Sequence, residues 1–207
     1  MRSLRKGASA THPGRAPRQK RTPLTVDEIL QLEAALMEVF RTIRQLRSRT
    51  SAARHIKFPP VPSVFSESIA IATTPVLFGS GWKGRYGGHE ADLIVENLTT
   101  RRSLKVEIKA TGQHAFQELK PKDLQADVLV WFRFGDRFES GTGPIEVAVL
   151  DSPGKYVKTQ CRLDVRRFEA IAGVQQAQKI FRFEGLTAML AEVDAKSPGG
   201  RSSTPSD

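Results

Sequence analysis

Two apolar runs near the middle of the chain constrain its fold more than any other feature. Residues 91–95 read Ala-Asp-Leu-Ile-Val, and residues 104–109 read Leu-Lys-Val-Glu-Ile-Lys. Side chains alternate between the two faces of a strand, so the second run would place its apolar and charged residues on opposite faces. An antiparallel pairing of Leu93 with Val106 aligns the apolar faces of both runs, and a slip by one residue would destroy this match. The two runs therefore predict a β-hairpin with a loop at residues 98–101.

The charged face of this hairpin carries the residues that could perform chemistry. The same register sets Asp92 opposite Glu107, and Lys109 lies on the face of Glu107. Opposed residues have Cβ atoms roughly 5 Å apart, and two carboxylates at that distance repel unless a proton or a cation lies between them. Mg²⁺ prefers oxygen ligands, usually one or two carboxylates with water and phosphate. Asp92 and Glu107 are therefore candidate metal ligands, and Lys109 could orient or deprotonate an attacking water or stabilise charge on a phosphate. The alternative is a solvated polar face on an ordinary hairpin.

The spacing of these residues resembles a known family. Ala91-Asp92 followed by Glu107-Ile108-Lys109 is similar to the motif of the PD-(D/E)XK nuclease superfamily, which includes many type II restriction endonucleases. Ala91 stands where the family name has proline. The resemblance covers about residues 63 to 134 and implies a mixed sheet flanked by helices, with the active site at the sheet edge. In that family a helix before the hairpin often supplies another carboxylate, and Glu67 in the apolar segment after Ser63 matches that position.

The resemblance implies a Mg²⁺-dependent DNA endonuclease, with Mn²⁺ able to substitute for Mg²⁺ and double-stranded DNA as the partner. Asp92 and Glu107 would hold the metal, Glu67 would support it directly or through water, and Lys109 would serve the nucleophile. Double-strand cutting by a small chain with one site favours a two-fold homodimer. The alternative function is a non-catalytic DNA-binding or assembly protein that uses the same fold as a scaffold.

A glycine-rich segment, residues 79–88, lies directly before the hairpin. It contains the pattern G-x-G-x-x-G, but a dinucleotide site would need a helix to follow, and a strand is expected instead. The segment also lacks the Gly-Lys-Ser/Thr of a phosphate-binding loop. We expect a flexible loop whose basic and aromatic side chains contact DNA backbone or bases. The four candidate DNA contacts in this loop are Trp82, Lys83, Arg85 and Tyr86. A plain glycine-rich turn is the alternative.

A long helix is predicted at the N-terminal side. Thr25 and Glu28 form a capping-box pattern, which predicts a helix that runs to about Thr50. Its apolar residues recur at alternating spacings of three and four, a pattern typical of a packed helix face or of a coiled-coil seam. These seam residues are Ile29, Leu32, Leu36, Val39, Ile43 and Leu46. Either the helix packs on its own domain, or it forms a homodimer interface. The arginines of its last turns suit a helix C-terminus and could also touch phosphates.

The charge of the chain is concentrated at its start. The net charge is +10, and residues 1–23 contribute seven basic residues without an acid. This tail is rich in proline and poor in large apolar residues, so we expect it to be disordered. It is either a non-specific DNA tether or a solvated tail without a function. The chain has no run of 18 apolar residues and a single cysteine, Cys161, so we expect no membrane association and a cytoplasmic location.

Strand and helix patterns mix without strict alternation, which predicts an α/β fold with a mixed central sheet flanked by helices and a long N-terminal helix. Further strands are expected near residues 127–134, 145–150 and 156–165, with short helices near 166–172 and 185–193. The expected organisation is a disordered basic tail (1–23), a long helix (24–57), a nuclease-like domain (58–195) and a disordered tail (196–207).

Overall fold

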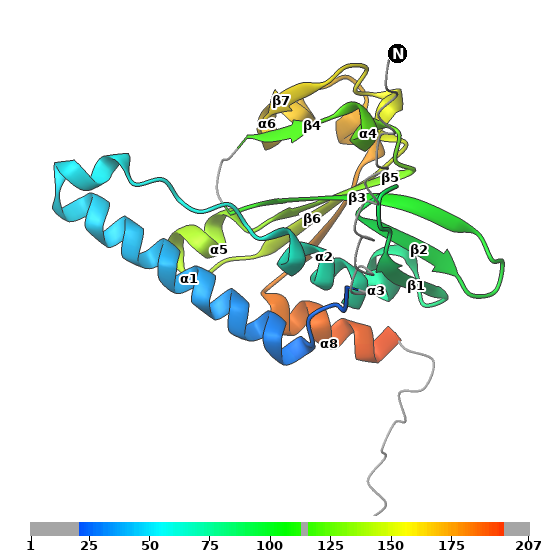
Figure 1. Cartoon of the computed structure of the whole chain (residues 1–207), viewed down its shortest axis with the longest axis horizontal. Helices are drawn as coiled ribbons and strands as arrows, with labels where there is room; N and C mark the ends of the chain where they lie inside the picture. Colours follow the sequence, from blue (N-terminus) through cyan, green and yellow to red (C-terminus); the bar gives the residue numbers. More distant parts are fainter. Residues whose placement is uncertain (1–20, 113–115, 197–207) are drawn as a thin grey trace, which may run out of the picture.

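A six-stranded mixed sheet lies at the centre of the molecule (Figure 1). The computed structural model describes residues 21–112 and 116–196. The strands lie in the order β1-β2-β3-β5-β6-β8, with bounds β1 Trp82–Tyr86, β2 Leu93–Asn97, β3 Ser103–Thr111, β5 Val128–Arg133, β6 Ile145–Asp151 and β8 Lys179–Phe183. β3 and β5 pair in parallel, and the other neighbouring strands of this sheet pair antiparallel. The predicted fold class is confirmed.

Each face of the sheet is covered by different elements (Figure 1). The first face is covered by α-helices, with bounds α1 Val26–Arg49, α2 Ser63–Ala72, α3 Thr74–Phe78, α5 Gly135–Ser140 and α8 Leu186–Lys196, and η1 Ser51–His55 follows the projecting end of α1 (Figure 1). The second face is covered by a two-stranded sheet and short helices, with bounds β4 Gln117–Leu119, α4 Pro121–Leu124, η2 Pro153–Lys155, β7 Cys161–Leu163, α6 Val165–Glu169 and α7 Val174–Ala177.

The apolar residues of β5 show why the sheet is buried on both sides. Val130 and Phe132 pack with the helices, whereas Leu129 and Trp131 pack beneath the small sheet. All six residues of β5 are therefore buried, as expected for a strand with both faces covered. The same alternation governs β3: Val106 and Ile108 belong to the helical core. Consequently Glu107 is placed on the face that the small sheet covers.

The predicted hairpin forms with the predicted register. β2 and β3 pair Leu93 with Val106 and Val95 with Leu104. The order of hydrophobic residues was sufficient here, because a slip would have exposed side chains that are buried. The ladder begins at Leu93, so Asp92 lies just outside it and does not form a rung with Glu107.

Helix α1 begins where its capping box predicts. The Glu28 N–H donates to Thr25 Oγ1, and the Thr25 N–H donates to Glu28 Oε2. The buried stripe, however, is Ile29, Glu33, Leu36 and Phe40 and not the seam expected from the sequence. Of that seam, Val39 and Leu46 are exposed. The N-terminal half of α1 packs in the same hydrophobic core as the sheet.

The segment predicted as a flexible glycine-rich loop is instead the edge strand β1, over residues 82–86. Gly84 explains part of the glycine content. A Cβ at Gly84 would lie 2.5 Å from Thr74 Oγ1 and 3.2 Å from Ile71 Cα, so only glycine allows the strand to approach the helices this closely. The glycine therefore serves packing here, and the expectation of a loop is wrong.

The remaining elements differ from the sequence predictions in detail. The strand expected over 156–165 is shorter, Cys161–Leu163, and β8 was not expected. Residues 1–20 of the basic tail and 197–207 of the C-terminal tail lie outside the described residues. Among the described helices, none has both the length and the apolar character needed to cross a membrane.

Candidate active site

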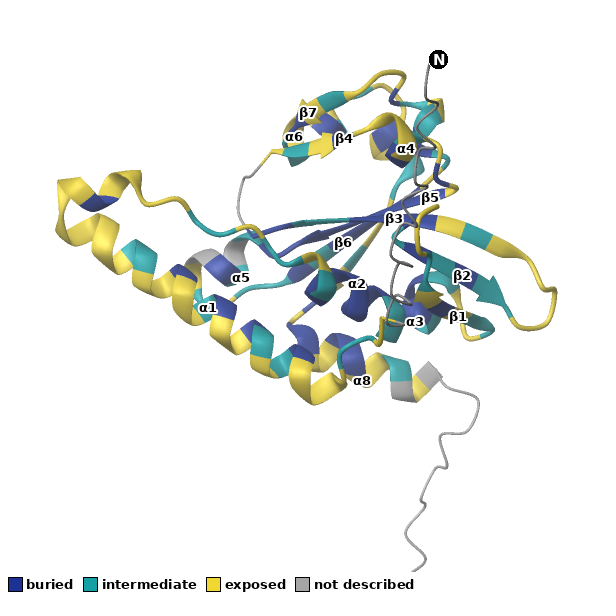
Figure 2. Ribbon diagram, in the orientation of Figure 1, coloured by how far each residue is buried: buried dark blue, intermediate teal, exposed yellow. Residues whose placement is uncertain are grey.

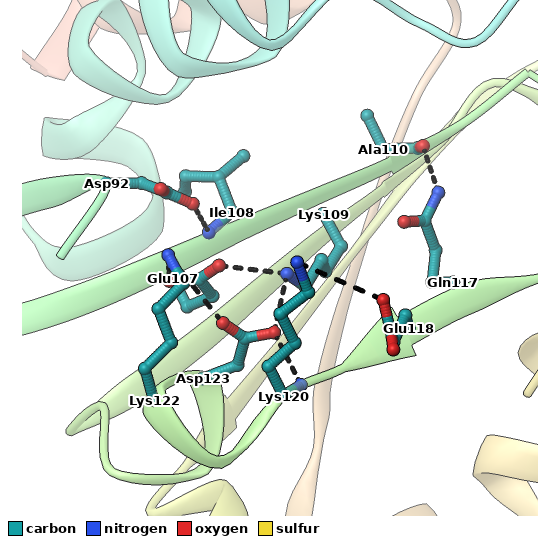
Figure 3. Close-up of polar contacts among 10 residues, drawn as sticks. All are labelled: Asp92, Glu107, Ile108, Lys109, Ala110, Gln117, Glu118, Lys120, Lys122 and Asp123. Carbon is teal, nitrogen blue, oxygen red and sulfur yellow. Dashed lines mark hydrogen bonds and ion pairs between the residues drawn. The ribbon is translucent and has the colours of Figure 1, made fainter. Parts of the chain in front are cut away.

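Strand β3 has an open edge beyond Val106, and the candidate site lies there (Figure 3). The pairing with β2 ends at Val106, while the pairing with β5 on the opposite edge continues to Thr111. Asp92 occupies the open edge, because its Oδ2 accepts the backbone N–H of Ile108 at 2.9 Å. The contact satisfies a donor that a continued ladder would have used, and it fixes the Asp92 carboxylate beside β3.

Glu107 is buried, which excludes a solvated polar face at this point of the hairpin. Its side chain is 4% exposed, and Lys109 Nζ lies 2.8 Å from Glu107 Oε1. The exposed Lys122 approaches the other oxygen, with Nζ 3.8 Å from Glu107 Oε2. Lys105, two residues earlier on the same strand face, shows the contrast: it is half exposed and pairs with the exposed Glu90. The charged face is therefore solvated at Lys105 and enclosed at Glu107.

Asp123 is a site residue that sequence reasoning missed. Its side chain is fully buried, and its Oδ2 lies 2.8 Å from Lys109 Nζ (Figure 3). The same oxygen accepts the backbone N–H of Lys120 at 2.8 Å, which places Asp123 at the start of α4. Asp123 Oδ1 is buried without a hydrogen-bond donor among the described residues. The sequence carries no local signal for this convergence, because β4 and α4 must first fold back over β3.

Glu67 reaches the site from α2, as the resemblance implies. Its side chain is 6% exposed, and Arg21 Nη1 lies 3.2 Å from Glu67 Oε2. Burial raises the pKa of Glu67, Asp92 raises it further, and Arg21 lowers it. Arg21 belongs to the segment predicted as a free tail. In the described part of that segment, residues 21–23, it instead contacts the candidate site and lies over the ring of Tyr86 at 5.4 Å.

The environment of Glu107 and Lys109 sets their protonation. Burial raises the pKa of Glu107 to about 7; Lys109 lowers it, and Asp92 and Asp123 raise it. Burial lowers the pKa of the Lys109 ammonium, but its contacts with Asp123 and Glu107 outweigh burial, so the pKa is raised overall. Lys109 is therefore a cation at neutral pH, whereas Glu107 exchanges its proton near neutrality.

The free energy of unfolding of the metal-free protein is expected to fall as the pH rises from about 4.5 to about 7. Folded Glu107 keeps its proton to about pH 7, whereas the unfolded side chain loses it near 4.5, so the folded state binds more protons in this window. The decrease amounts to up to about 3 kcal/mol, and Glu67 adds to the same trend because its pKa is also raised.

Denaturant unfolding in EDTA across this pH range measures the effect. The Glu107→Gln variant should show a flatter profile than the parent, because glutamine does not titrate. The same slope in both proteins would contradict the assignment to Glu107.

The four predicted DNA contacts do not form one group. Lys83 and Arg85 are exposed, whereas Trp82 packs against Phe78 with ring centroids 6.2 Å apart. Arg85 and Tyr86 line a cavity of about 590 Å³ that also reaches Asp92. Its lining residues are Arg21, Pro23, Ile71, Gly84, Arg85, Tyr86, Gly88, His89, Ala91 and Asp92. Arg85 and Tyr86 thus lie beside the candidate site, whereas Trp82 is partly buried and packs against the hydrophobic core.

The donor set suits a cation held by two carboxylates. Within residues 21–112 and 116–196, no three or more His, Cys, Asp or Glu side chains form a group that could hold a metal ion. Mg²⁺, however, usually binds through one or two carboxylates, with water and phosphate as its other ligands. Asp92 raises the pKa of both Glu67 and Glu107, so the carboxylates at this edge repel one another. A divalent ion between Asp92 and Glu107 would relieve that repulsion.

Comparisons of the chain with protein-family models, with curated proteins and with solved structures find no match.

Proposed function

We propose that this chain is a Mg²⁺-dependent endonuclease that hydrolyses phosphodiester bonds in double-stranded DNA, in the manner of a restriction endonuclease. The observation that carries the proposal is that Asp92 lies at the open edge of β3 beside the buried Glu107, which contacts Lys109 at 2.8 Å. Strongly perturbed pKa values that arise from burial and charge partners are typical of functional sites.

Each residue has a distinct role in this proposal. Asp92 and Glu107 would hold Mg²⁺, for which Mn²⁺ would substitute. Such an ion would polarise the phosphate and lower the pKa of a water. Lys109 acts as a hydrogen-bond donor that orients the water and offsets charge on the phosphate, since its raised pKa disfavours a role as a base. Lys122 carries an exposed ammonium 3.8 Å from Glu107 and can meet the phosphate. Glu67 would support the metal through water once Arg21 releases it.

Two further expectations belong to this proposal. Cleavage of both strands by a chain with one such cluster favours a two-fold homodimer, and a DNA substrate suits a cytoplasmic location.

The test is incubation of the purified protein with duplex DNA of mixed sequence. Cleavage is expected with Mg²⁺ or Mn²⁺ and is expected to stop in EDTA. The Lys105→Ala variant is a matched control, because Lys105 lies on the same strand face but outside the cluster; it should cleave like the parent.

A scaffold function on the same fold is the second candidate. The observation that favours it is the double pairing of Lys109 with Glu107 and Asp123, both at 2.8 Å, since buried ion pairs also occur as structural networks. The two functions differ in their response to metal. A ligand of the folded state raises the melting temperature, so the nuclease should show a Mg²⁺-dependent shift. If the protein does not cleave DNA and its melting temperature does not change with Mg²⁺ or Mn²⁺, the scaffold function is favoured.

A further inference from the structure

The C-terminal half of α1 and the segment that follows it form a projecting, strongly basic surface. We define the basic arm as residues 41–57; it contains six cations and no acid. The cations are Arg41, Arg44, Arg47, Arg49, Arg54 and Lys57. The four acids of α1, the last of them Glu38, all precede the arm. In Figure 1 the end of α1 and η1 extend well beyond the sheet, and Figure 2 shows that most of this end is exposed.

The arm is fixed to the domain at defined points. Arg44 donates to the Phe138 carbonyl, and the Arg47 guanidinium lies 5.2 Å from the centroid of the Phe58 ring. Phe58 in turn stacks on Phe40 with centroids 5.0 Å apart. The direction of the arm is therefore set by the contacts of Arg44 and Arg47 and by the packing of Phe58, the residue that follows the arm.

For three exposed cations of the arm, interactions within the described part of the chain explain at most Arg49. Arg49, Arg54 and Lys57 are exposed, and none of them forms an ion pair with any residue that the structure describes. Interaction with the helix macrodipole is confined to the last turn. It can explain Arg49 but not Arg54 or Lys57, which lie beyond the helix.

The arm is close enough to the candidate site for one duplex to touch both. A Cβ at Gly112 would lie 2.7 Å from Phe40 Cζ, so the base of the arm contacts the end of β3. From Lys109 to Gly112 the strand spans about 10 Å, and from Phe40 to Arg49 the helix spans about 13 Å. Arg49 thus lies within about 34 Å, one turn of duplex, of Lys109.

We propose that the basic arm binds the phosphate backbone of duplex DNA on one flank of the cleavage position. The inference rests on the proposed function, since it takes the same duplex as the partner. Val39, Leu46 and Ile56 are exposed apolar residues in or next to the arm, which would suit a second copy of the chain. Two copies of a segment with six cations and no acid would repel each other, however, whereas the charge of the arm complements a polyanion.

The experiment measures DNA binding without cleavage. Fluorescence anisotropy of a labelled duplex of about three helical turns is recorded in EDTA over a series of salt concentrations, with the full chain. The triple variant Arg49→Gln, Arg54→Gln, Lys57→Gln should bind more weakly, and its log–log salt slope should be smaller by about 1 for each phosphate that is no longer neutralised, about 3 in all. The matched control removes three exposed cations from elements outside the arm: Lys155→Gln, Arg166→Gln and Lys179→Gln. It should retain the parental slope.

A charge-conserving variant separates charge from folding. Arg49→Lys, Arg54→Lys, Lys57→Arg should keep most of the parental slope, and all variants should keep the parental circular dichroism spectrum. An unchanged slope in the Gln triple variant overturns the proposal, as does an equal decrease in the control. Conversion of a dimer to a monomer by the Gln triple variant with the slope intact assigns the arm to self-association instead. Binding is measured without metal, so the two proposals can fail separately. If the salt slope depends on the arm but the protein never cleaves DNA, only the nuclease proposal is refuted. If the protein cleaves DNA but the slope does not depend on the arm, only the proposal for the arm is refuted.

Discussion

Replacement of Glu107 by Gln is expected to lower DNA cleavage by orders of magnitude while the protein remains folded. The change removes one of the two carboxylates proposed to hold the metal, so the water and the phosphate lose their activation. At neutral pH and above, the variant should also be as stable as the parent or more stable. Burial raises the pKa of Glu107 to about 7, so the parent must hold an unfavourable buried charge above that pH, whereas glutamine has none.

The measurement combines cleavage rates with melting temperatures in EDTA and in Mg²⁺. The parent should melt at a higher temperature in Mg²⁺, and Glu107→Gln should show a much smaller shift. Glu90→Gln is the matched control, since Glu90 is an exposed carboxylate that pairs with Lys105 on the neighbouring, solvated part of the hairpin; it should behave like the parent. If Glu107→Gln unfolds the protein while Mg²⁺ never changes the parental melting temperature, the cluster is a structural network.

Lys109→Ala, unlike Glu107→Gln, should lower the free energy of unfolding. It leaves the fully buried Asp123 with the exposed and more distant Lys122, whose Nζ lies 3.9 Å from Asp123 Oδ1, and removal of one partner of a buried pair costs about 3–5 kcal/mol. Lys109→Arg preserves the charge and should restore most of that stability. A Lys109→Ala protein as stable as the parent would show that Asp123 does not depend on the ion pair.

Replacement of Phe40 by Ala is expected to destabilise the protein by about 3–5 kcal/mol, the range typical of large aromatic residues removed from a core. Phe40 is 1% exposed and lies 5.0 Å from both the Phe58 and the Phe138 ring centroids. The cavity would be hard to refill, because Gly112 directly beneath the Phe40 ring contributes no side chain. The free energy of unfolding in denaturant measures the effect.

The neighbouring Val39→Ala is the control for this prediction. Val39 is 44% exposed, and exposed substitutions usually change stability by less than about 0.5 kcal/mol. A large, concentration-dependent destabilisation in Val39→Ala would place the sequence-predicted seam in a homodimer interface.

The sequence by itself determined the elements whose signals are local. The hairpin register followed from alternation, because a one-residue shift would expose Leu93 and Val106, which are both buried. The start of α1 followed from the capping box at Thr25, which satisfies helical N–H groups within one turn. The sequence also predicted that Asp92 and Glu107 lie close together, since a hairpin brings residues near in sequence together in space.

Local patterns misled where packing between distant segments decided the outcome. The glycine-rich segment of 79–88 was expected to be a loop, but the close approach of Gly84 to Ile71 and Thr74 makes glycine a requirement of a packed strand. The apolar spacing of α1 indicated a seam through Val39 and Leu46. Phe40 and the polar Glu33 are buried instead, because Phe40 packs against Phe138 and Glu33 pairs with Arg137 of α5.

Only the tertiary structure decided the electrostatic character of the candidate site. Asp123 contacts Lys109 because β4 and α4 fold back across β3, and Arg21 reaches Glu67 across 46 positions of sequence. The burial that raises the pKa of Glu107 comes from this covering layer and not from the strand that carries Glu107. Spacing along the chain can indicate which charges share a strand face, but desolvation depends on everything packed above that face. For this reason the sequence predicted the acid–acid–lysine set, and the fold alone supplied its fourth charged partner and its protonation.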